Sequence, residues 1–307
     1  MTKGFVTIAT GHERYYKLAV NLRRSYRQNC ENPLPFAIIA DRTNKFTDEF
    51  DDVVILDNAT HSWMDKMRLL DSCPYDENLF LDADCLVYQD INFLWDLFSG
   101  ADDFSCFGKA YPLDAKGGWF TNQASQFYPI KFCTHLHGIL YFIRKSETLA
   151  RMQTLCNDII ANYKNVVFKS FNGLLADEPV YALAMAVLDL HPVERKVEHY
   201  CFVPYATEFS SNYSRRAVRY LYPGETKPNT SYIVHWGNQN TLRANYRFDA
   251  GALNFKRKDG VVFALLYRYG LLLPVYKTID FIKDLWKKAV WYGGRAIQKI
   301  RRLLLKK

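Results

Sequence analysis

Short apolar runs alternate with amphipathic segments over the first 90 residues of this chain, and no other sequence feature restricts the possible folds as strongly. Four of the runs have the length of a strand, at residues 4–10, 35–41, 52–57 and 78–84. Residues 13–28 and 62–72 carry apolar side chains at helical spacing, and Ser62 is an expected N-cap. Strands and helices that alternate in this way form βαβ units, so the pattern predicts an α/β fold with a mostly parallel sheet flanked by helices.

Two more predicted strands and two more predicted helices follow. Residues 138–146 and 231–237 are apolar runs of strand length, and residues 146–163 and 176–190 show helical periodicity. In sheets of this kind, ligands bind beyond the carboxyl ends of the strands. Polar residues at those ends are therefore the first candidates for a functional site.

The run at residues 78–84 ends in two aspartates, Asp82 and Asp84, which are separated by one residue. Burying a carboxylate is costly unless a cation accompanies it. Two carboxylates at a strand end can hold one hard divalent ion, with Asp84 chelating the ion and Asp82 beside it. Lys66 lies on a predicted helix that runs back toward this strand and supplies a positive charge. The alternative is an acidic turn that caps the next helix.

The sequence around these aspartates resembles that of a known family. Residues 66–98, KMRLLDSCPYDENLFLDADCLVYQDINFLWDLF, are similar to the central stretch of GT-A-fold glycosyltransferases of family 8, which include glycogenins and bacterial galactosyltransferases. Three more stretches occur in the order of that family, at residues 5–27, 137–146 and 232–237. The resemblance therefore extends over residues 4–240.

The resemblance implies a transferase that uses a UDP-sugar, with a GT-A catalytic domain at residues 1–250 and retention at the anomeric carbon. The implied cofactor is Mn2+ or Mg2+, and a histidine ligand favours Mn2+. By position, the resemblance makes Asp84 the metal chelator and Asp82 a bridge between metal and ribose. His235 completes the protein ligands, and Lys66 neutralises the diphosphate.

The resemblance also indicates where the nucleotide binds. Thr10, His12 and Tyr15 fall where the family holds uracil and ribose, and either Tyr15 or Tyr16 is expected to stack on the base. After His235 this chain departs from the family, because a Lys-Pro-Trp stretch that carries a diphosphate-binding lysine is absent. Arg243 is a candidate substitute.

A second acidic pair, Asp177 and Glu178, begins a predicted helix. In a retaining enzyme, a carboxylate near the anomeric carbon stabilises or attacks an oxocarbenium-like transition state. In an inverting enzyme, it would deprotonate the acceptor hydroxyl. Asp177 is the first catalytic candidate and Glu178 the second, and the alternative is a helix start that is merely enriched in acids.

His135 and His137, two residues apart in an extended segment, are candidates for acceptor binding.

The chain's net charge of +8 is concentrated in its last 52 residues. Residues 256–307 contain 14 Lys and Arg and three acids, for a net charge of +11, which leaves −3 for residues 1–255. The mildly acidic body is not expected to bind nucleic acid. Along residues 278–307, apolar residues recur every three or four positions with cations between them, and Gly293-Gly294 is a candidate hinge.

This pattern predicts that residues 251–307 form a basic, amphipathic segment that binds an anionic membrane surface. Residues 260–276 are interrupted by Arg268 and Pro274, so they are not expected to cross a membrane. The alternative is a helix that packs on the catalytic body and exposes a solvated basic face.

The seven cysteines are scattered without a paired spacing, so they predict no disulfide framework and no zinc site. Together with a first segment that does not resemble a signal peptide, they predict a cytoplasmic protein attached peripherally to a membrane. The expected acceptor is a glycan or a lipid-linked sugar of surface polysaccharide or glycoconjugate synthesis.

Two alternative functions remain. One is a phosphatase of the haloacid dehalogenase type with Asp82 as nucleophile, although Leu86 replaces the Thr or Val of that motif. The other is a non-catalytic assembly protein that binds nucleotide sugars.

Overall fold

The computed structural model describes residues 1–113, 115, 118–120, 122–166, 175–196, 198–255 and 261–304. The chain separates into two compact units. Unit 1 comprises Met1–Phe202 and Asn229–His235, and unit 2 comprises Val203–Pro228 and Trp236–Lys307.

The central sheet of unit 1 has six strands in the order β3-β2-β1-β4-β7-β6. Their bounds are β1 (Lys3–Ala9), β2 (Phe36–Ala40), β3 (Asp52–Ile55), β4 (Glu77–Leu81), β6 (Phe104–Pro112) and β7 (Phe132–Arg144). Strands β3, β2, β1 and β4 pair in parallel, whereas β7 is antiparallel to both β4 and β6. The predicted α/β fold with a mostly parallel sheet is confirmed, and β6 is a strand that the sequence pattern did not reveal.

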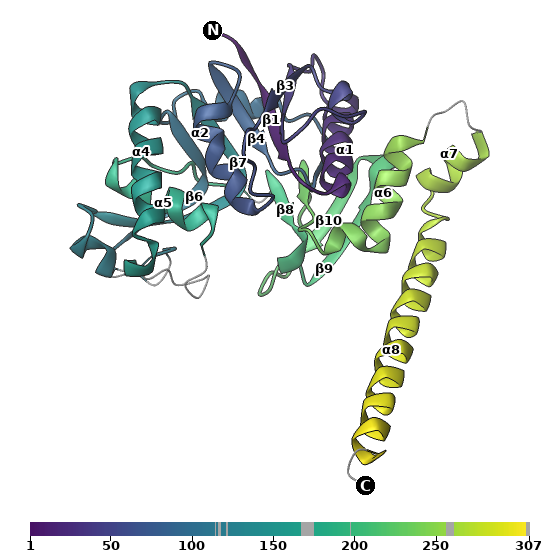
Figure 1. Ribbon diagram of the computed structural model, residues 1–307. Helices are drawn as coiled ribbons and strands as arrows, with labels where there is room; N and C mark the ends of the chain where they lie inside the picture. Colours follow the sequence, from purple (N-terminus) through teal and green to yellow (C-terminus); the bar gives the residue numbers. More distant parts are fainter. Residues whose placement is uncertain are drawn as a thin grey trace. The chain divides into compact units, whose positions relative to one another are not determined.

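Helices cover both faces of this sheet. They are α1 (Glu13–Asn29), α2 (Leu69–Ser72), α3 (Phe93–Phe98), α4 (Glu147–Ala161) and α5 (Asp177–Val187). Successive side chains of a strand point to opposite faces, so Phe5 packs in the layer of α1 and α3 and Val6 in the layer of α2, α4 and α5 (Figure 1). Strands that are buried on both faces are continuously apolar, which explains the runs in the sequence.

Several turns of the chain are short 3-10 helices. They are η1 (Thr47–Glu49), η2 (Trp63–Arg68), η3 (Asn122–Gln126), η4 (Tyr163–Asn165), η5 (Val203–Tyr205), η6 (Tyr213–Arg215) and η7 (Asn240–Leu242). The helix predicted at residues 62–72 is divided between η2 and α2. Ser62 caps it as expected, because its side chain accepts a hydrogen bond from the N–H of Met64 at 3.2 Å.

A smaller sheet joins distant parts of unit 1. It contains β5 (Cys85–Val87), β8 (Tyr200–Phe202) and β11 (Ile233–His235), with β11 in the middle. Strand β11 is antiparallel to β5, and His235 pairs with Cys85. Because the chain leaves the central sheet after β4 and enters β5 at once, the turn at residues 82–84 lies beside the end of β11.

Unit 2 contains a hairpin and three helices. The strands are β9 (Glu208–Asn212) and β10 (Ala217–Leu221), and the helices are α6 (Ala244–Asn254), α7 (Val261–Arg268) and α8 (Leu273–Leu304). The buried carboxylate of Asp249 in α6 accepts hydrogen bonds from the N–H of Tyr213, at 2.8 Å, and from the hydroxyl of Ser211. These bonds fix α6 to the end of the hairpin.

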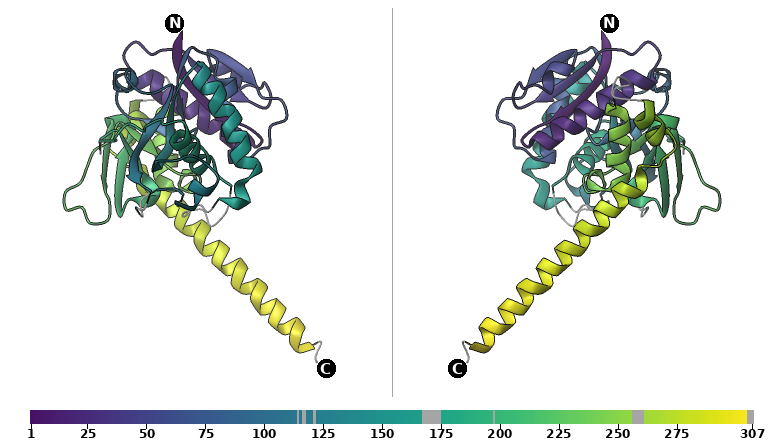
Figure 2. Two further views of the ribbon diagram at one scale, coloured as in Figure 1. Left: turned by 90° about the vertical axis from the view of Figure 1, so that its left-hand side faces the viewer. Right: turned by 90° about the vertical axis from the view of Figure 1, so that its right-hand side faces the viewer.

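The predicted amphipathic helix of the tail is α8. It begins at Leu273, earlier than expected, because Pro274 is tolerated in a first turn, where its missing N–H would have no partner. It continues without a break through Gly293 and Gly294, so the predicted hinge is absent (Figure 2). Two ion pairs join its first half to the region of α6: Arg247 binds Asp280, and Arg243 lies 3.1 Å from Asp284.

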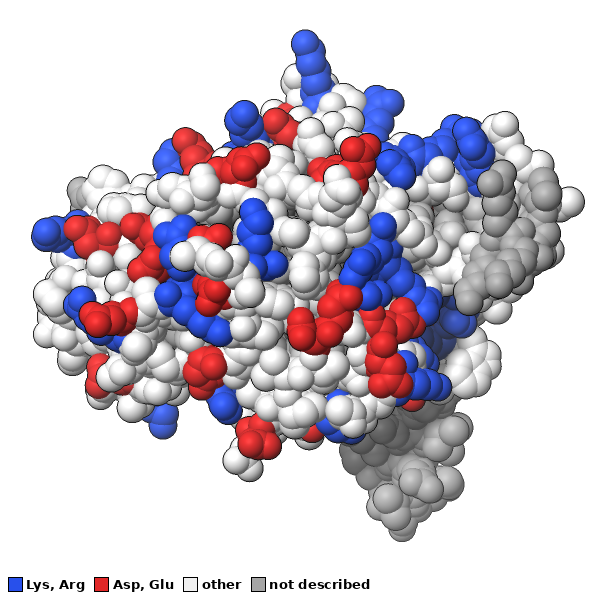
Figure 3. Space-filling model, turned by 90° about the horizontal axis from the view of Figure 1, so that it is seen from above, with Lys and Arg blue, Asp and Glu red and all other residues white. Residues whose placement is uncertain are grey.

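Acidic and basic side chains are interspersed on the face of the molecule that Figure 3 shows.

Candidate functional site

Asp82 and Asp84 form a tight turn at the carboxyl end of β4. The N–H of Asp82 donates to the carbonyl oxygen of Ile139 in β7 at 3.0 Å, and the carbonyl oxygen of Asp82 accepts from the N–H of Cys85 at 3.0 Å. These bonds fix the backbone on both sides of the acidic pair. The turn lies at the edge where ligands bind in sheets of this type.

Lys66, in η2, bridges two carboxylates from different elements. Its Nζ lies 2.6 Å from Oδ1 of Asp82 and 3.5 Å from Oδ2 of Asp177. Burial would lower the pKa of the ammonium, but Asp177 and Asp82 outweigh burial and raise it. Lys66 therefore stays charged and connects the strand-end aspartates to the acidic start of α5.

His235, the last residue of β11, contacts both aspartates of the turn. Its Nε2 lies 3.1 Å from Oδ1 of Asp84 and 3.6 Å from Oδ2 of Asp82. The ring of Phe202 packs against the imidazole, with the ring centroids 4.8 Å apart. The three residues that the sequence nominated as metal ligands thus lie together, although β4 and β11 are far apart in the chain.

The electrostatics of this cluster favour the binding of a cation. Burial raises the pKa of Asp82 to about 6. Burial would also raise the pKa of Asp84 and lower the pKa of His235, but their ion pair reverses both effects. The charge of Asp82 is therefore compensated mainly by Lys66, and that of Asp84 mainly by His235. A divalent ion can take over part of this compensation, and its binding releases any proton that a ligand holds.

The positions of the donor atoms also fit a divalent ion. Two adjacent ligands of an octahedral ion, each at about 2.1 Å from it, lie about 3.0 Å apart. The distance of 3.1 Å between Nε2 of His235 and Oδ1 of Asp84 matches this separation. Carboxylate oxygens suit Mg2+ and Mn2+, and the imidazole shifts the preference toward Mn2+.

The sequence reasoning missed one donor atom of this cluster, the thiol of Cys85. The ligand atoms of Asp84, Cys85 and His235 all lie within 4.8 Å of one another. Cys85 directly follows Asp84, but its proximity to His235 depends on the pairing of β5 with β11. No local sequence pattern reveals that pairing, so the thiol looked like an ordinary core residue.

Asp177 and Glu178 begin α5, on the other side of Lys66. Oδ2 of Asp177 accepts from the hydroxyl of Tyr141 at 2.9 Å, and Oε1 of Glu178 accepts from the N–H of Gly138 at 3.0 Å. Burial and the charge of Asp177 raise the pKa of Glu178 to about 8. At neutral pH, Glu178 is therefore mostly protonated, while Asp177 pairs with Lys66. Two acids in different environments can serve as an acid and a base in one reaction.

Gly138 is a further residue that the sequence reasoning did not single out, although it heads a predicted strand. A Cβ atom at this position would lie 2.6 Å from Cγ and Oε1 of Glu178 and 2.6 Å from the hydroxyl of Tyr141. Only glycine allows β7 to approach the start of α5 this closely. The approach also brings the N–H of Gly138 within reach of Glu178.

Thr10, His12 and Tyr15 lie around the start of α1. The hydroxyl of Thr10 donates to Oδ2 of Asp65 at 2.7 Å. The side chain of His12 caps α1, with Nδ1 accepting from the N–H of Arg14 at 3.0 Å. Tyr15 is 36% exposed, whereas Tyr16, the next residue, is buried. Thr10 and His12 therefore shape the backbone of this loop, and Tyr15 presents a ring to solvent.

Tyr16, the other candidate for stacking on a base, is completely buried and donates a hydrogen bond to Asp41. Asp41 also accepts from the N–H of Gly11 at 3.2 Å. Next to these residues is a cavity of about 320 Å³. It is lined by Glu13, Tyr16, Arg42, Asn44, Lys45 and Phe46. Burial of Tyr16 leaves Tyr15 as the stacking candidate.

His135 and His137 are aromatic neighbours on β7. His135 stacks on Trp119, with the ring centroids 4.3 Å apart, and Nδ1 of His137 is hydrogen-bonded to the hydroxyl of Tyr200. Burial and the charge of Arg195 lower the pKa of His137 to about 4, so it is neutral at pH 7. The side-chain position of Gly138 faces Glu178, so the preceding His137 points to the opposite face of β7, toward Tyr200.

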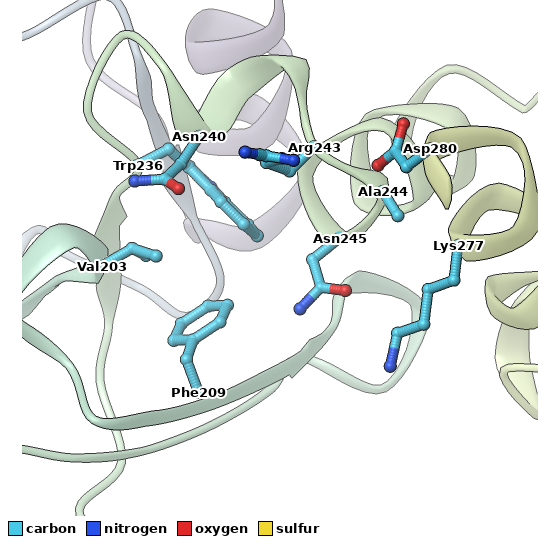
Figure 4. A pocket seen from close by; sticks show the side chains of 9 residues that line it. All are labelled: Val203, Phe209, Trp236, Asn240, Arg243, Ala244, Asn245, Lys277 and Asp280. Carbon is cyan, nitrogen blue, oxygen red and sulfur yellow. The ribbon is translucent and has the colours of Figure 1, made fainter. Parts of the chain in front are cut away.

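Arg243, the candidate substitute for the missing lysine, belongs to unit 2. There it lines a cavity of about 240 Å³ that also borders α8 (Figure 4). The lining residues are Val203, Phe209, Trp236, Asn240, Arg243, Ala244, Asn245, Lys277 and Asp280. Within this unit, the guanidinium of Arg243 is paired with Asp284.

Comparisons with known proteins identify the fold. No protein-family model matches the chain, and no curated protein matches it. Among solved structures, it is similar to the galactosyltransferase LgtC in complex with donor and acceptor sugar analogues, with 12% identity and a TM-score of 0.50 over 83% of this chain and 98% of LgtC. It is also similar to the bifunctional glycosyltransferase WbbM, with 10% identity and a TM-score of 0.51 over 82% of this chain and 49% of WbbM. The chain therefore has the GT-A fold of glycosyltransferases.

Proposed function

We propose that a chain with this fold is a metal-dependent glycosyltransferase, which moves a hexose from a UDP-sugar to a glycan or lipid-linked acceptor with retention of configuration. The observation that carries the proposal is the cluster of Asp82, Asp84 and His235 beside Lys66, at a strand end of a glycosyltransferase fold. LgtC was solved with donor and acceptor sugar analogues, and we extend that substrate class to this chain.

The reaction separates a sugar from a nucleoside diphosphate, so negative charge develops on the leaving group. Bound Mn2+ or Mg2+ would supply Lewis-acid stabilisation of that charge. In our proposal, Asp84 and His235 would hold the ion, and Asp82 would contribute to binding both the ion and the ribose. Lys66 keeps Asp82 in position through their 2.6 Å ion pair and adds positive charge beside the diphosphate.

We assign the acidic pair at the start of α5 to the anomeric carbon. Lys66 and Tyr141 orient the carboxylate of Asp177, which suits a group that stabilises or attacks an oxocarbenium-like centre. The raised pKa of Glu178 leaves it protonated at neutral pH, so it suits a hydrogen-bond donor better than a nucleophile. Asp177 is therefore our first catalytic candidate and Glu178 the second.

We propose that the nucleotide binds at the start of α1. The ring of Tyr15 is exposed there, and aromatic faces stack readily on bases. Thr10 and His12 support the loop that precedes the helix through the bonds described above.

The test is the release of UDP from a panel of nucleotide sugars in the presence of Mn2+. We expect one UDP-sugar to be consumed, a chelator to abolish the activity, and Asp84→Asn to reduce it at least 100-fold, since a lost Lewis acid typically costs several kcal/mol. Asp48→Asn changes an exposed acid outside the site and serves as the matched control.

Two results would overturn the proposal. Tight binding of a UDP-sugar without turnover in any acceptor mixture would favour the non-catalytic alternative. Release of phosphate from phosphomonoesters would favour the phosphatase. That alternative expects its Asp-x-Asp at the first strand, whereas here the motif follows β4.

We further propose that α8 attaches the protein to the cytoplasmic face of an anionic membrane. Five apolar residues spaced by three or four positions form one stripe of the helix, and all are exposed: Val275, Ile279, Ile282, Trp286 and Val290. Asp280 and Asp284, which pair with the region of α6, lie on the opposite side of α8. The helix therefore turns its charged side to its own unit and its apolar stripe to solvent.

An exposed apolar stripe among cations is the pattern of a helix that lies in a membrane interface. Within the described residues, no helix has the length and apolarity needed to cross a bilayer. Attachment in the plane of the interface is therefore the mode we propose.

A further inference from the structure

The thiol of Cys85 gives the strand-end cluster a donor set that differs from the one in the proposed reaction. That reaction uses the oxygens of Asp82 and Asp84 together with His235. The donors that actually gather within 4.8 Å of one another are the carboxylate of Asp84, the imidazole of His235 and the sulfur of Cys85. Asp82 is not a member of this set: its Oδ1 pairs with Lys66 at 2.6 Å, and its Oδ2 lies 3.6 Å from Nε2 of His235.

The sheet that joins β5 and β11 determines which way the thiol points. Residues paired directly across antiparallel strands have their side chains on the same face. Cys85 pairs with His235 in this register, so the thiol and the imidazole lie side by side. Cys201 belongs to the neighbouring strand β8 and pairs with Val234 of β11. Because Val234 directly precedes His235, the side chain of Cys201 lies on the opposite face of this sheet from those of Cys85 and His235.

The class of ion follows from the chemistry of the donors. Thiolate and imidazole ligands select thiophilic ions such as Zn2+, Cd2+ and Co2+, whereas carboxylates alone suit Mg2+ and Mn2+. A site with one oxygen, one nitrogen and one sulfur donor resembles the three-ligand zinc sites that leave a position for a further ligand. Cys85 is completely buried, so a metal–sulfur bond would be shielded from water.

We propose that Asp84, Cys85 and His235 form a binding site for a thiophilic divalent ion, which competes with the ion that serves sugar transfer. The thiol loses its proton to solvent as the metal–sulfur bond forms. Because both modes use Asp84 and His235, one ion excludes the other. Micromolar Zn2+ or Cd2+ therefore inhibits the Mn2+-dependent reaction, and Asp82 remains with Lys66 in the inhibited form.

Absorption spectroscopy of the full chain tests the site without any measurement of sugar transfer. We expect Co2+ added to chelator-treated protein to produce a sulfur-to-cobalt charge-transfer band in the near-ultraviolet. The band disappears in Cys85→Ser and persists in Cys201→Ser, which removes a thiol that is equally buried in the same sheet. Cys85→Ala repeats the test without a buried hydroxyl, and circular dichroism of each variant verifies that it folds.

Competition measurements complete the test. We expect the affinity for Cd2+ to fall at least tenfold in Cys85→Ala while the affinity for Mn2+ changes less than threefold. The proposal is overturned if wild-type protein gives no charge-transfer band, or if the band survives in both Cys85 variants. A chain that shows the band but transfers no sugar would contradict the proposed function and leave this site intact.

Discussion

Glu178 holds a proton that an ordinary glutamate would release. Its pKa is raised from 4.5 to about 8 by burial and by Asp177. Between these two pH values, the unfolded chain has lost the proton and the folded chain has kept it. The free energy of unfolding therefore falls as pH rises from about 4.5 to about 8, because the folded state binds more protons.

We predict that Glu178→Gln removes this fall in the free energy of unfolding at high pH, since a glutamine cannot ionise and still accepts a hydrogen bond from Gly138. In a chelator, the melting temperatures of the variant and the wild type should be close near pH 5, and the variant should melt several degrees higher at pH 8. Glu147→Gln, an exposed acid at the start of α4, is the matched control and should show no such difference. Parallel melting curves of Glu178→Gln and wild type across this pH range would mean that Glu178 ionises normally.

Burial would lower the pKa of His235, but Asp84 and Asp82 raise it, and in our proposal the imidazole binds a metal ion. We predict that His235→Ala weakens Mn2+ binding at least tenfold, or about 1.4 kcal/mol, and leaves the binding of UDP without metal unchanged. Calorimetric titration of UDP with and without Mn2+ measures both quantities. His191→Ala removes a histidine that lies 3.6 Å from Asp189, away from these ligands, and should have no effect. If His235→Ala retains full affinity for Mn2+, His235 is not a metal ligand and has only a structural role.

At the level of secondary-structure elements, β7 approaches the start of α5 closely, and we propose that this approach assembles the catalytic part of the site. We predict that Gly138→Ala destabilises the protein by about 1–3 kcal/mol, the usual cost of overpacking, because its Cβ would lie 2.6 Å from Glu178. Thermal unfolding measures the loss. Gly100→Ala adds a methyl group with no heavy atom within 4 Å and should be nearly neutral.

A double variant separates the clash from the loss of backbone freedom. If Glu178 is the obstacle, Glu178→Ala should recover part of the stability lost in Gly138→Ala, so the two changes are less than additive. Full additivity would contradict the contact between β7 and α5 on which our catalytic assignment depends.

The elements also show how far sequence reasoning can reach. The strands β1 to β4, the helices α1, α4 and α5, and the positions of Asp82 and Asp84 were predictable because apolar periodicity and strand-end acids are local signals. His235 was singled out only through the family resemblance. The pairing of β11 with β5 was not predictable, because it joins segments that are far apart in the chain. Cys85 and Gly138 acquire their roles only through such contacts. Strand β6 was missed because it lies outside the βαβ pattern.

The molecule as a whole presents its apolar stripe on α8 rather than burying it. We predict that Ile282→Ser combined with Trp286→Ser lowers binding to anionic vesicles several-fold, because the two side chains are 58% and 69% exposed and lie on the stripe. Cosedimentation with anionic and neutral vesicles measures the change. Binding of the wild type to anionic vesicles should weaken as the salt concentration rises, because salt screens the attraction between charges. Part of the binding should persist at high salt, because apolar side chains insert into the membrane.

The matched control for this prediction is Val53→Ser, which removes an exposed apolar side chain from β3 in unit 1. Vesicle binding by this variant should equal that of the wild type. If the double variant on α8 also binds as well as the wild type, the stripe is not the membrane-binding surface.

Lys66 shares one ammonium group between Asp82 and Asp177, and this arrangement links the two ends of the site thermodynamically. A cation that takes over the neutralisation of Asp82 leaves Lys66 more available to Asp177. Linkage is reciprocal, so the state of Asp177 must in turn change the affinity for the cation. Asp177→Asn would leave Lys66 entirely to Asp82 and thus make it a stronger competitor for the incoming ion. In our proposal, Asp177 therefore influences the affinity for the cation through Lys66, although it is not itself a ligand of that ion.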